Sequence, residues 1–213
     1  MSILSCAFYL GDTVQTAQRL LGKYVVRMLD GQALVARITE TEAYVGRMDK
    51  AAHAYNYRQT ARNAAMFGPP GHAYVYMIYG MHHCLNFVTE PEGEPSAVLL
   101  RGLEPVYGLD EMARLRFGKT WDALTRTQRR NITNGPGKCC RALAIDRAEH
   151  GRPRGGGALC LHFARGRGAA GGDAPALYHA HRQAHRDRLC RGGSQLPVAL
   201  LAGKRGRINS ADF

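Results

Sequence analysis

The chain has 213 residues and a formal net charge of +12, since 29 Lys and Arg residues outnumber 17 Asp and Glu residues. This length supports a single hydrophobic core, and the positive charge favours a polyanionic partner, with nucleic acid as the first candidate. No stretch approaches about 18 consecutive apolar residues, and Met1–Leu10 is too short and uncharged for a secretory signal, so we expect a cytoplasmic protein that does not associate with membranes.

The positive charge is concentrated toward the C-terminal end. Residues 1–150 hold 18 basic against 14 acidic residues, whereas residues 151–213 hold 11 against 3. We therefore divide the chain into a core over 1–150 and a basic tail over 151–213 that is rich in Gly, Arg and His. The six cysteines have no regular spacing, and without an export signal we expect reduced thiols rather than disulfides.

Cap and turn residues divide the first part of the chain into a helix followed by a hairpin. Asp12 or Thr13 is a suitable N-cap for a helix that Gly22 ends, and Asp30-Gly31 is a strong two-residue hairpin turn. The sequence predicts a helix over 12–21 and strands over 24–28 and 33–44.

A second hairpin follows a polar loop. Aromatic and β-branched residues flank Tyr79-Gly80, which predicts a hairpin over 72–88 with Tyr79 and Met81 near its tip. The other expectations are a polar loop over 49–62, a strand over 97–101, helices over 108–117 and 121–130, a glycine-rich turn over 134–138 and a helix over 139–144. Together these elements predict one α+β domain with a mixed, mostly antiparallel sheet, flanking helices and a protruding hairpin.

The strand over 33–44 ends in an acidic pattern. Glu40, Glu42 and Tyr44 alternate along it and therefore share one face. This is either a solvated edge strand with Lys or Arg partners or a pair of carboxylates that carries out chemistry. Same-face neighbours lie about 7 Å apart at Cα, a separation that is also possible for the acid and base of a carbohydrate hydrolase.

Other features have both a structural and a functional interpretation. Tyr79 near the tip of the predicted hairpin is either an exposed residue that can wedge between base pairs or a tyrosine that is buried in the core or in a dimer contact. A histidine in a loop, such as His53, is usually only hydrogen-bonded. The segment 134–138 is a backbone contact to a nucleic-acid phosphate or simply the start of a helix. The spacing of His82-His83-Cys84 and Cys139-Cys140 does not fit paired metal ligands, so we expect neither metal nor another cofactor.

Several multi-residue motifs occur in order between residues 7 and 146. They are Glu40-Thr41-Glu42-Ala43-Tyr44, Ala51-Ala52-His53, Arg58-Gln59-Thr60, Arg62-Asn63, Tyr74-Val75-Tyr76, Ile78-Tyr79-Gly80-Met81, Asn86, Leu99-Leu100-Arg101, Glu104-Pro105, Asn134-Gly135-Pro136 and Lys138. Together they resemble the alkyladenine (3-methyladenine) DNA glycosylases of the mammalian alkylpurine type, here in a bacterial form. His82 and His83 depart from the pattern, since the family more often has aromatic residues there.

The resemblance implies a base-excision-repair enzyme that flips alkylated or deaminated purines out of duplex DNA and hydrolyses the N-glycosidic bond. It implies that Glu42 is the general base that activates water, and that Tyr44, His53, Tyr76 and Asn86 form the base pocket. An aromatic pocket attracts a cationic alkylated purine, and Asn86 matches the residue that disfavours guanine.

The same resemblance assigns contacts to double-stranded DNA that contains damaged purines. Tyr79 and Met81 match intercalating positions, and the expected phosphate contacts are Arg58, Arg62, Arg101 and Lys138. No lysine nucleophile is implied, so we expect a monofunctional, monomeric enzyme that leaves an abasic site, located with the bacterial nucleoid.

The likeness ends near Glu149, where the family continues with an Arg-Ile/Thr-Gly-Ile segment and a closing Pro-Trp-Arg-Phe/Tyr strand. Residues 151–213 are either a disordered basic DNA-binding tail or the product of a reading-frame shift, which we favour. Leu196–Ala202 permits codons whose frame one base later reads Arg-Trp-Arg-Tyr-Trp-Leu, and Asp187–Arg191 likewise permits Ile-Gly-Cys-Ala-Gly. The gene sequence across codons 146–213 tests this. Loss of the closing segments would instead predict a catalytically impaired DNA-binding protein.

Overall fold

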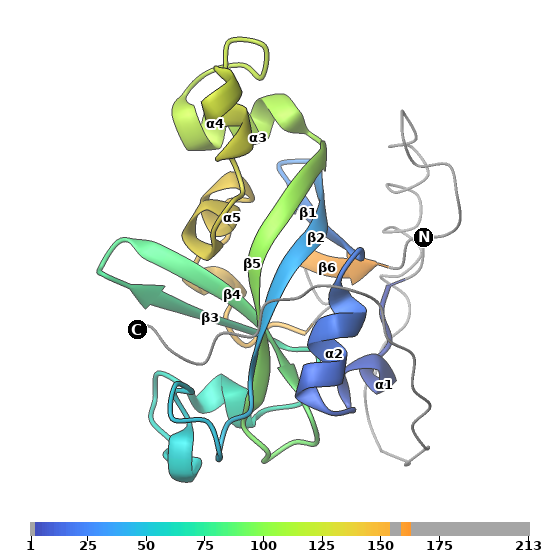
Figure 1. Cartoon of the computed structure of the whole chain (residues 1–213), viewed down its shortest axis with the longest axis vertical. Helices are drawn as coiled ribbons and strands as arrows, with labels where there is room; N and C mark the ends of the chain where they lie inside the picture. Colours follow the sequence, from blue (N-terminus) through green and yellow to red (C-terminus); the bar gives the residue numbers. More distant parts are fainter. Residues whose placement is uncertain (1–2, 154–158, 163–213) are drawn as a thin grey trace.

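Six strands form one sheet in the part of the chain that the computed structural model describes, residues 3–153 and 159–162 (Figure 1). Their order across the sheet is β3-β4-β5-β2-β1-β6, and every neighbouring pair is antiparallel. The predicted α+β class and mostly antiparallel sheet are confirmed. The strands are β1 Tyr24–Leu29, β2 Gln32–Tyr44, β3 Ala73–Ile78, β4 His82–Thr89, β5 Ser96–Tyr107 and β6 Leu159–His162.

Short helices surround this sheet (Figure 1). The side chain of Asp12 accepts a hydrogen bond from the backbone N–H of Gln15 and caps α2, as its sequence predicts. In the described residues, no helix has the length and apolar character needed to cross a membrane. The helices are α1 Cys6–Tyr9, α2 Thr13–Leu20, α3 Leu109–Phe117, α4 Arg126–Arg130 and α5 Pro136–Ala142, with 3-10 turns η1 Tyr55–Tyr57, η2 Ala64–Phe67 and η3 Arg147–Glu149.

Two predicted helices begin elsewhere than expected. The helix predicted over 121–130 begins only at Arg126, because Thr125 and Gln128 form a reciprocal capping box that fixes the first turn of α4. The helix predicted over 139–144 is α5, which begins at Pro136, since a proline suits the first helical position. The expectation of reduced thiols holds for the free Cys84, Cys139 and Cys140 but is wrong for Cys6, which is disulfide-bonded.

One face of the sheet carries the main hydrophobic core. Val75 of β3, Phe87 of β4 and Leu100 of β5 are fully or almost fully buried there, and they pack with residues from α1, α2, α3 and α5. The opposite face, at the β3-β4-β5 end, carries a smaller cluster that is rich in tyrosine. Since side chains alternate between the faces of a strand, the same strands build both environments.

A register irregularity decides which way the acidic stretch of β2 points. Leu34, Ala36 and Ile38 belong to the main core. The pairing with β5 shifts between Ile38 and Glu40, and a shift of one residue moves the following side chains to the opposite face. Ala43 therefore packs against the main core, whereas Tyr44 packs with the tyrosine-rich cluster.

The chain beyond Glu149 contributes to both edges of the sheet. At the β3 edge, the Gly151 N–H donates to the Ala73 carbonyl and the Ala73 N–H donates to the Arg152 carbonyl, both at 2.8 Å. At the other edge, β6 pairs with β1. The division of the chain at residue 150 stays a prediction. The segments 187–191 and 196–202, on which the reading-frame hypothesis depends, lie outside the described residues.

Candidate active site

A cavity of about 510 Å³ lies on the tyrosine-rich face of the sheet. Residues from β2, the β3–β4 hairpin, β5 and the loop between β2 and β3 line it. The structure brings together the predicted pocket residues, which come from sequence positions more than 40 residues apart. The lining includes Tyr44, His53, Tyr76 and Asn86, together with Tyr79 and Arg62.

Glu42 is not one of the residues that line this cavity, but the strand pairing places it directly beside the lining. Glu42 of β2 pairs with Leu99 of β5, Leu99 pairs with Asn86 of β4, and Asn86 pairs with Tyr74 of β3. Directly paired residues point to the same face, and neighbouring strands are about 5 Å apart, so Glu42 is about 10 Å from Asn86 across the sheet. Leu99 and Asn86 line the cavity, and Glu42 is the next residue on the same face across the sheet.

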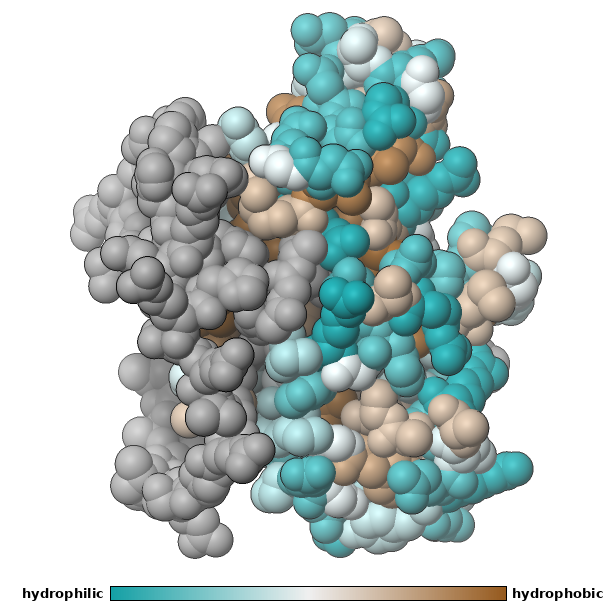
Figure 2. All heavy atoms as spheres, turned by 180° about the vertical axis from the view of Figure 1, so that it is seen from behind, coloured by the Kyte–Doolittle hydropathy of each residue, from teal (hydrophilic) through white to brown (hydrophobic). Residues whose placement is uncertain are grey.

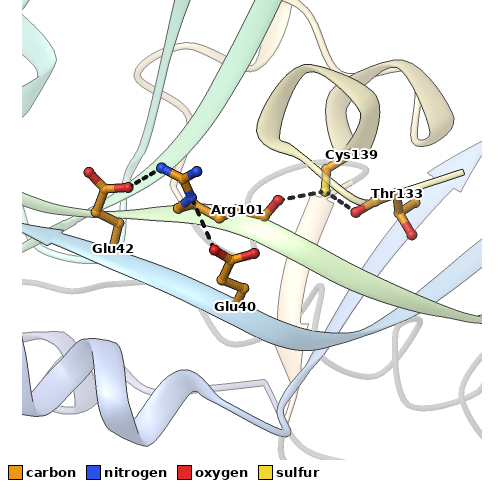
Figure 3. Close-up of polar contacts among 5 residues, drawn as sticks. All are labelled: Glu40, Glu42, Arg101, Thr133 and Cys139. Atoms are coloured by element: carbon orange, nitrogen blue, oxygen red, sulfur yellow. Dashed lines mark hydrogen bonds and ion pairs between the residues drawn. The ribbon is translucent and has the colours of Figure 1, made fainter. Parts of the chain in front are cut away.

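Arg101 holds the Glu42 carboxylate (Figure 3). One guanidinium nitrogen donates to Glu42 Oε2 at 2.5 Å, and Nε lies 3.2 Å from Glu40 Oε1. The Glu42 side chain is 15% exposed and that of Glu40 is 50% exposed. The acid pair is therefore asymmetric, because Glu42 has the closer contact to Arg101 and the more enclosed position.

A bulge in β5 places Arg101 between the two carboxylates. Glu40 pairs with Gly102 and Thr41 pairs with Leu100, so Arg101 is the additional residue in β5. The position is tight, since a Cβ at Gly102 would lie 3.1 Å from the Glu40 Cβ and would have to displace the Glu40 side chain slightly. On the α5 side, the Cys139 thiol lies 3.7 Å from the Arg101 carbonyl and 3.0 Å from the Thr133 carbonyl (Figure 3).

Three aromatic rings form one wall of the cavity. The His53 and Tyr76 rings meet edge to face with centroids 4.6 Å apart, and Tyr74 lies 5.3 Å from Tyr76. Burial raises the pKa of Tyr76 and raises that of Tyr74 to about 12. Burial and the neighbouring Glu42 carboxylate raise the pKa of Tyr44. All three tyrosines are therefore neutral at physiological pH.

His53 is oriented by two partners. Its Nδ1 is 2.7 Å from the Tyr74 hydroxyl, and its carbonyl accepts a hydrogen bond from the Asn63 side chain at 2.8 Å. Contact with the aromatic wall removes water from one side of the ring, and together with the Arg62 guanidinium this lowers the pKa of His53 below its ordinary value of 6.5. The imidazole is therefore neutral at pH 7.

Asn63 organises the loop above the cavity, a role that the sequence motif did not reveal. It is almost fully buried, and its side-chain amide also donates to the Arg58 carbonyl at 2.8 Å, while its oxygen accepts from the Thr60 N–H at 2.7 Å. Tyr74 was likewise missed as the partner of His53. Polar residues beside an expected pocket residue were the available signal, but the contacts themselves are tertiary.

Asn86 is a buried polar residue in the cavity lining. Its amide donates to the carbonyl of Tyr74 at 3.0 Å and to that of Cys84 at 3.4 Å. Both donors therefore bind the hairpin's own backbone. Because the orientation of the amide is fixed in this way, Asn86 presents a rigid polar surface to the cavity.

The β3–β4 hairpin protrudes from the body of the molecule (Figure 1) and forms a separate knob at one edge when seen from behind (Figure 2). At its tip, the side chains of Tyr79 and Met81 are 76% and 71% exposed. Tyr79 and Gly80 have φ angles of +51° and +68° and are the left-handed central residues of a β-turn in which the Met81 N–H donates to the Ile78 carbonyl at 3.2 Å. A tyrosine in that conformation costs about 1–2 kcal/mol, and such a strained residue at an exposed tip favours a functional role.

The four predicted phosphate-binding residues occupy different environments. Arg58 is exposed, and Lys138 is partly buried with Nζ 3.3 Å from the Asn131 side-chain oxygen. Arg62 lies at the cavity, and Arg101 is bound to Glu40 and Glu42. Phosphate contacts by these residues stay predictions.

Comparison with known proteins gives one consistent result. The sequence model of the family described as Methylpurine-DNA glycosylase (MPG) matches residues 7–175. A relative from Bacillus cereus (strain ATCC 14579) is 52% identical over 145 residues, which are 68% of this chain and 70% of the relative. Relatives from Bacillus cytotoxicus and Alkaliphilus oremlandii are 54% and 51% identical over 144 residues, 68% of this chain and 70% and 71% of their own lengths. The names of all three contain the words "3-methyladenine DNA glycosylase".

Proposed function

The chain belongs to the methylpurine-DNA glycosylase family, and from that membership and the cavity we propose that it releases damaged purines from duplex DNA by hydrolysis. The family and the names of the relatives support a DNA glycosylase that acts in DNA repair. The observation that carries the finer proposal is the position of Glu42, held by Arg101 at the edge of an aromatic cavity.

The cavity suits a single flipped base. Its volume of about 510 Å³ lies within the ~300–1,000 Å³ range of small-molecule sites. Tyr44, Tyr76 and His53 offer aromatic surfaces on which a purine can stack, and Asn86 adds a polar group of fixed orientation to the lining. In this proposal Tyr79 fills the gap in the base stack, and its exposure at the hairpin tip supports that role.

Glu42 performs the proton chemistry in this proposal. As the bond between the purine nitrogen and C1′ breaks, the electron pair leaves with the base and positive charge develops on the sugar. The Glu42 carboxylate stabilises that charge and removes a proton from the water that adds to C1′. Arg101 keeps the carboxylate oriented. The products are a free purine and an abasic site, and the strand is not cut.

The test is release of free purine from methylated duplex DNA by the full chain and by Glu42→Gln. We expect the variant to bind DNA while its release rate falls about 10²–10⁴-fold, the range for loss of a general base. Glu40→Gln is the matched control, because it removes the more exposed carboxylate on the same strand face and should retain most activity.

Three other outcomes would contradict the proposal. If the native chain binds DNA but releases no base, the chain is a DNA-binding protein without the activity. Strand cleavage in the absence of alkali would contradict a monofunctional reaction. Equal losses in Glu40→Gln and Glu42→Gln would instead favour a carboxylate pair that acts together, as in a carbohydrate hydrolase.

A further inference from the structure

Arg62 places a positive charge on the lining of the cavity. Among the described residues that line it, Arg62 is the only side chain charged at neutral pH. None of the ion pairs found in the described part of the chain includes Arg62. Its positive charge is therefore not cancelled by a bound carboxylate.

Two contacts hold the guanidinium over the aromatic wall. It donates to the Met77 carbonyl on the hairpin at 2.9 Å, and its central carbon lies 5.8 Å from the centroid of the Tyr76 ring. The Tyr76 ring also lines the cavity, so a purine stacked on it would lie within one Debye length, ~10 Å, of the positive charge. Burial chiefly, and the Arg62 charge in addition, lower the pKa of His53, which lines the same cavity.

The charge of the base distinguishes two classes of damaged purine. A purine alkylated on a ring nitrogen is cationic before the bond to C1′ breaks and leaves as a neutral molecule. A deaminated or ethenoadenine-type purine is neutral at first and leaves as an anion, which then takes up a proton. A fixed cation near the base disfavours binding of the first class and stabilises the departing group of the second.

Building on the proposed glycosylase function, we propose that Arg62 is a specificity-determining residue that shifts preference from cationic alkylpurines toward neutral purines that leave as anions. This differs from the phosphate contact expected from the sequence. A phosphate contact is common to all substrates and would not discriminate between bases.

The experiment compares kcat/KM for duplexes that contain hypoxanthine or 7-methylguanine. In Arg62→Gln we expect the ratio of hypoxanthine to 7-methylguanine activity to fall about tenfold, the effect of a partly screened charge at this range. Arg62→Lys keeps the charge and should retain most of the ratio. Arg58→Gln is the matched control, since Arg58 is exposed on the same loop and does not line the cavity, and its ratio should not change.

Equal loss of both activities in Arg62→Gln would overturn the proposal in favour of a phosphate contact, and an unchanged ratio with unchanged rates would overturn it outright. A binding measurement separates this proposal from the proposed glycosylase activity. The affinities for the same two duplexes are measured for Glu42→Gln and for the double variant Glu42→Gln/Arg62→Gln, and their ratios are compared. If the native chain releases no base, the proposed function fails, yet a shift of the affinity ratio toward 7-methylguanine still supports the role of Arg62, and no shift contradicts it.

Discussion

The two faces of the sheet are built from the same strands but differ in almost every physical property. On one face, Val75, Phe87 and Leu100 are covered by helices and exclude water. On the other, their chain neighbours Tyr76 and Asn86 line a cavity and make directed polar or aromatic contacts. Of two adjacent residues, one therefore stabilises the core and the other lines the cavity, because alternation along a strand places neighbours on opposite faces.

The difference shows why the bulges matter. Without the shift after Ile38, the even-numbered positions of β2 would continue to face the main core, and Glu42 would be a buried carboxylate among apolar side chains. The shift instead places Glu42 and Tyr44 on the cavity face. The additional residue in β5 then supplies Arg101 as the cation that accompanies them.

The largest effect in this comparison is expected from removing Arg101, the cation that is paired with Glu42. Arg101→Gln leaves Glu42 without the guanidinium that orients its carboxylate, and we expect purine release to fall about 10²-fold. Stability should fall by only about 1–3 kcal/mol, since Glu42, 15% exposed, loses a charged hydrogen-bond partner but keeps some contact with water. Single-turnover kinetics and urea unfolding measure the two quantities, and a large stability loss with unchanged kinetics would contradict the assignment.

A smaller effect is expected at the hairpin tip, which belongs to neither face. Tyr79→Ala removes the exposed ring that we propose fills the gap left by a flipped base, so kcat/KM on duplex DNA should fall about tenfold, the value of ~1–2 kcal/mol of lost stacking. Release from single-stranded DNA should be unaffected, because there is no intact base stack to fill. Equal losses on single and double strands would exclude an intercalating role.

The smallest effect concerns pH. The folded state holds the pKa of His53 below 6.5, so as pH falls past 6.5 the unfolded chain binds a proton that the folded chain resists. Through His53, the free energy of unfolding is therefore unaffected above pH 6.5 and decreases below it. The loss in Tm between about pH 7.5 and about pH 5.5 should be smaller in His53→Gln than in the native chain. An identical loss would show that His53 is not desolvated in the folded state.

Local patterns were sufficient to predict most elements of the fold. The cap at Asp12, the turn at Asp30-Gly31 and the hairpin around Tyr79-Gly80 are determined by neighbouring residues, and all three are present. The start of α4 at Arg126 was not predicted, because residues 121–125 also have helical propensity and only the capping contacts of Thr125 show that the helix begins after them.

The candidate site was predicted in composition but not in arrangement. Motif resemblance identified Tyr44, His53, Tyr76 and Asn86, which all line the cavity, although their individual roles stay predictions. The bulge at Arg101, the contact of Arg62 with the hairpin and the buried links of Asn63 were not predictable, because each depends on the pairing or packing of segments distant in sequence.

The central claim is that one face of the sheet determines stability and the other determines base preference. It is tested most directly at two neighbours on β4, Asn86 and Phe87. For each alanine variant, the free energy of unfolding and the relative release of hypoxanthine and 7-methylguanine are measured together. Phe87→Ala should lose about 3–5 kcal/mol of stability with an unchanged base preference, since its ring fills the main core. Asn86→Ala should lose only about 1–2 kcal/mol, for its two hydrogen bonds, and should change the preference. If Phe87→Ala changes the preference as much as Asn86→Ala does, or if Asn86→Ala leaves it unchanged, the separation of stability from chemistry across this sheet is wrong.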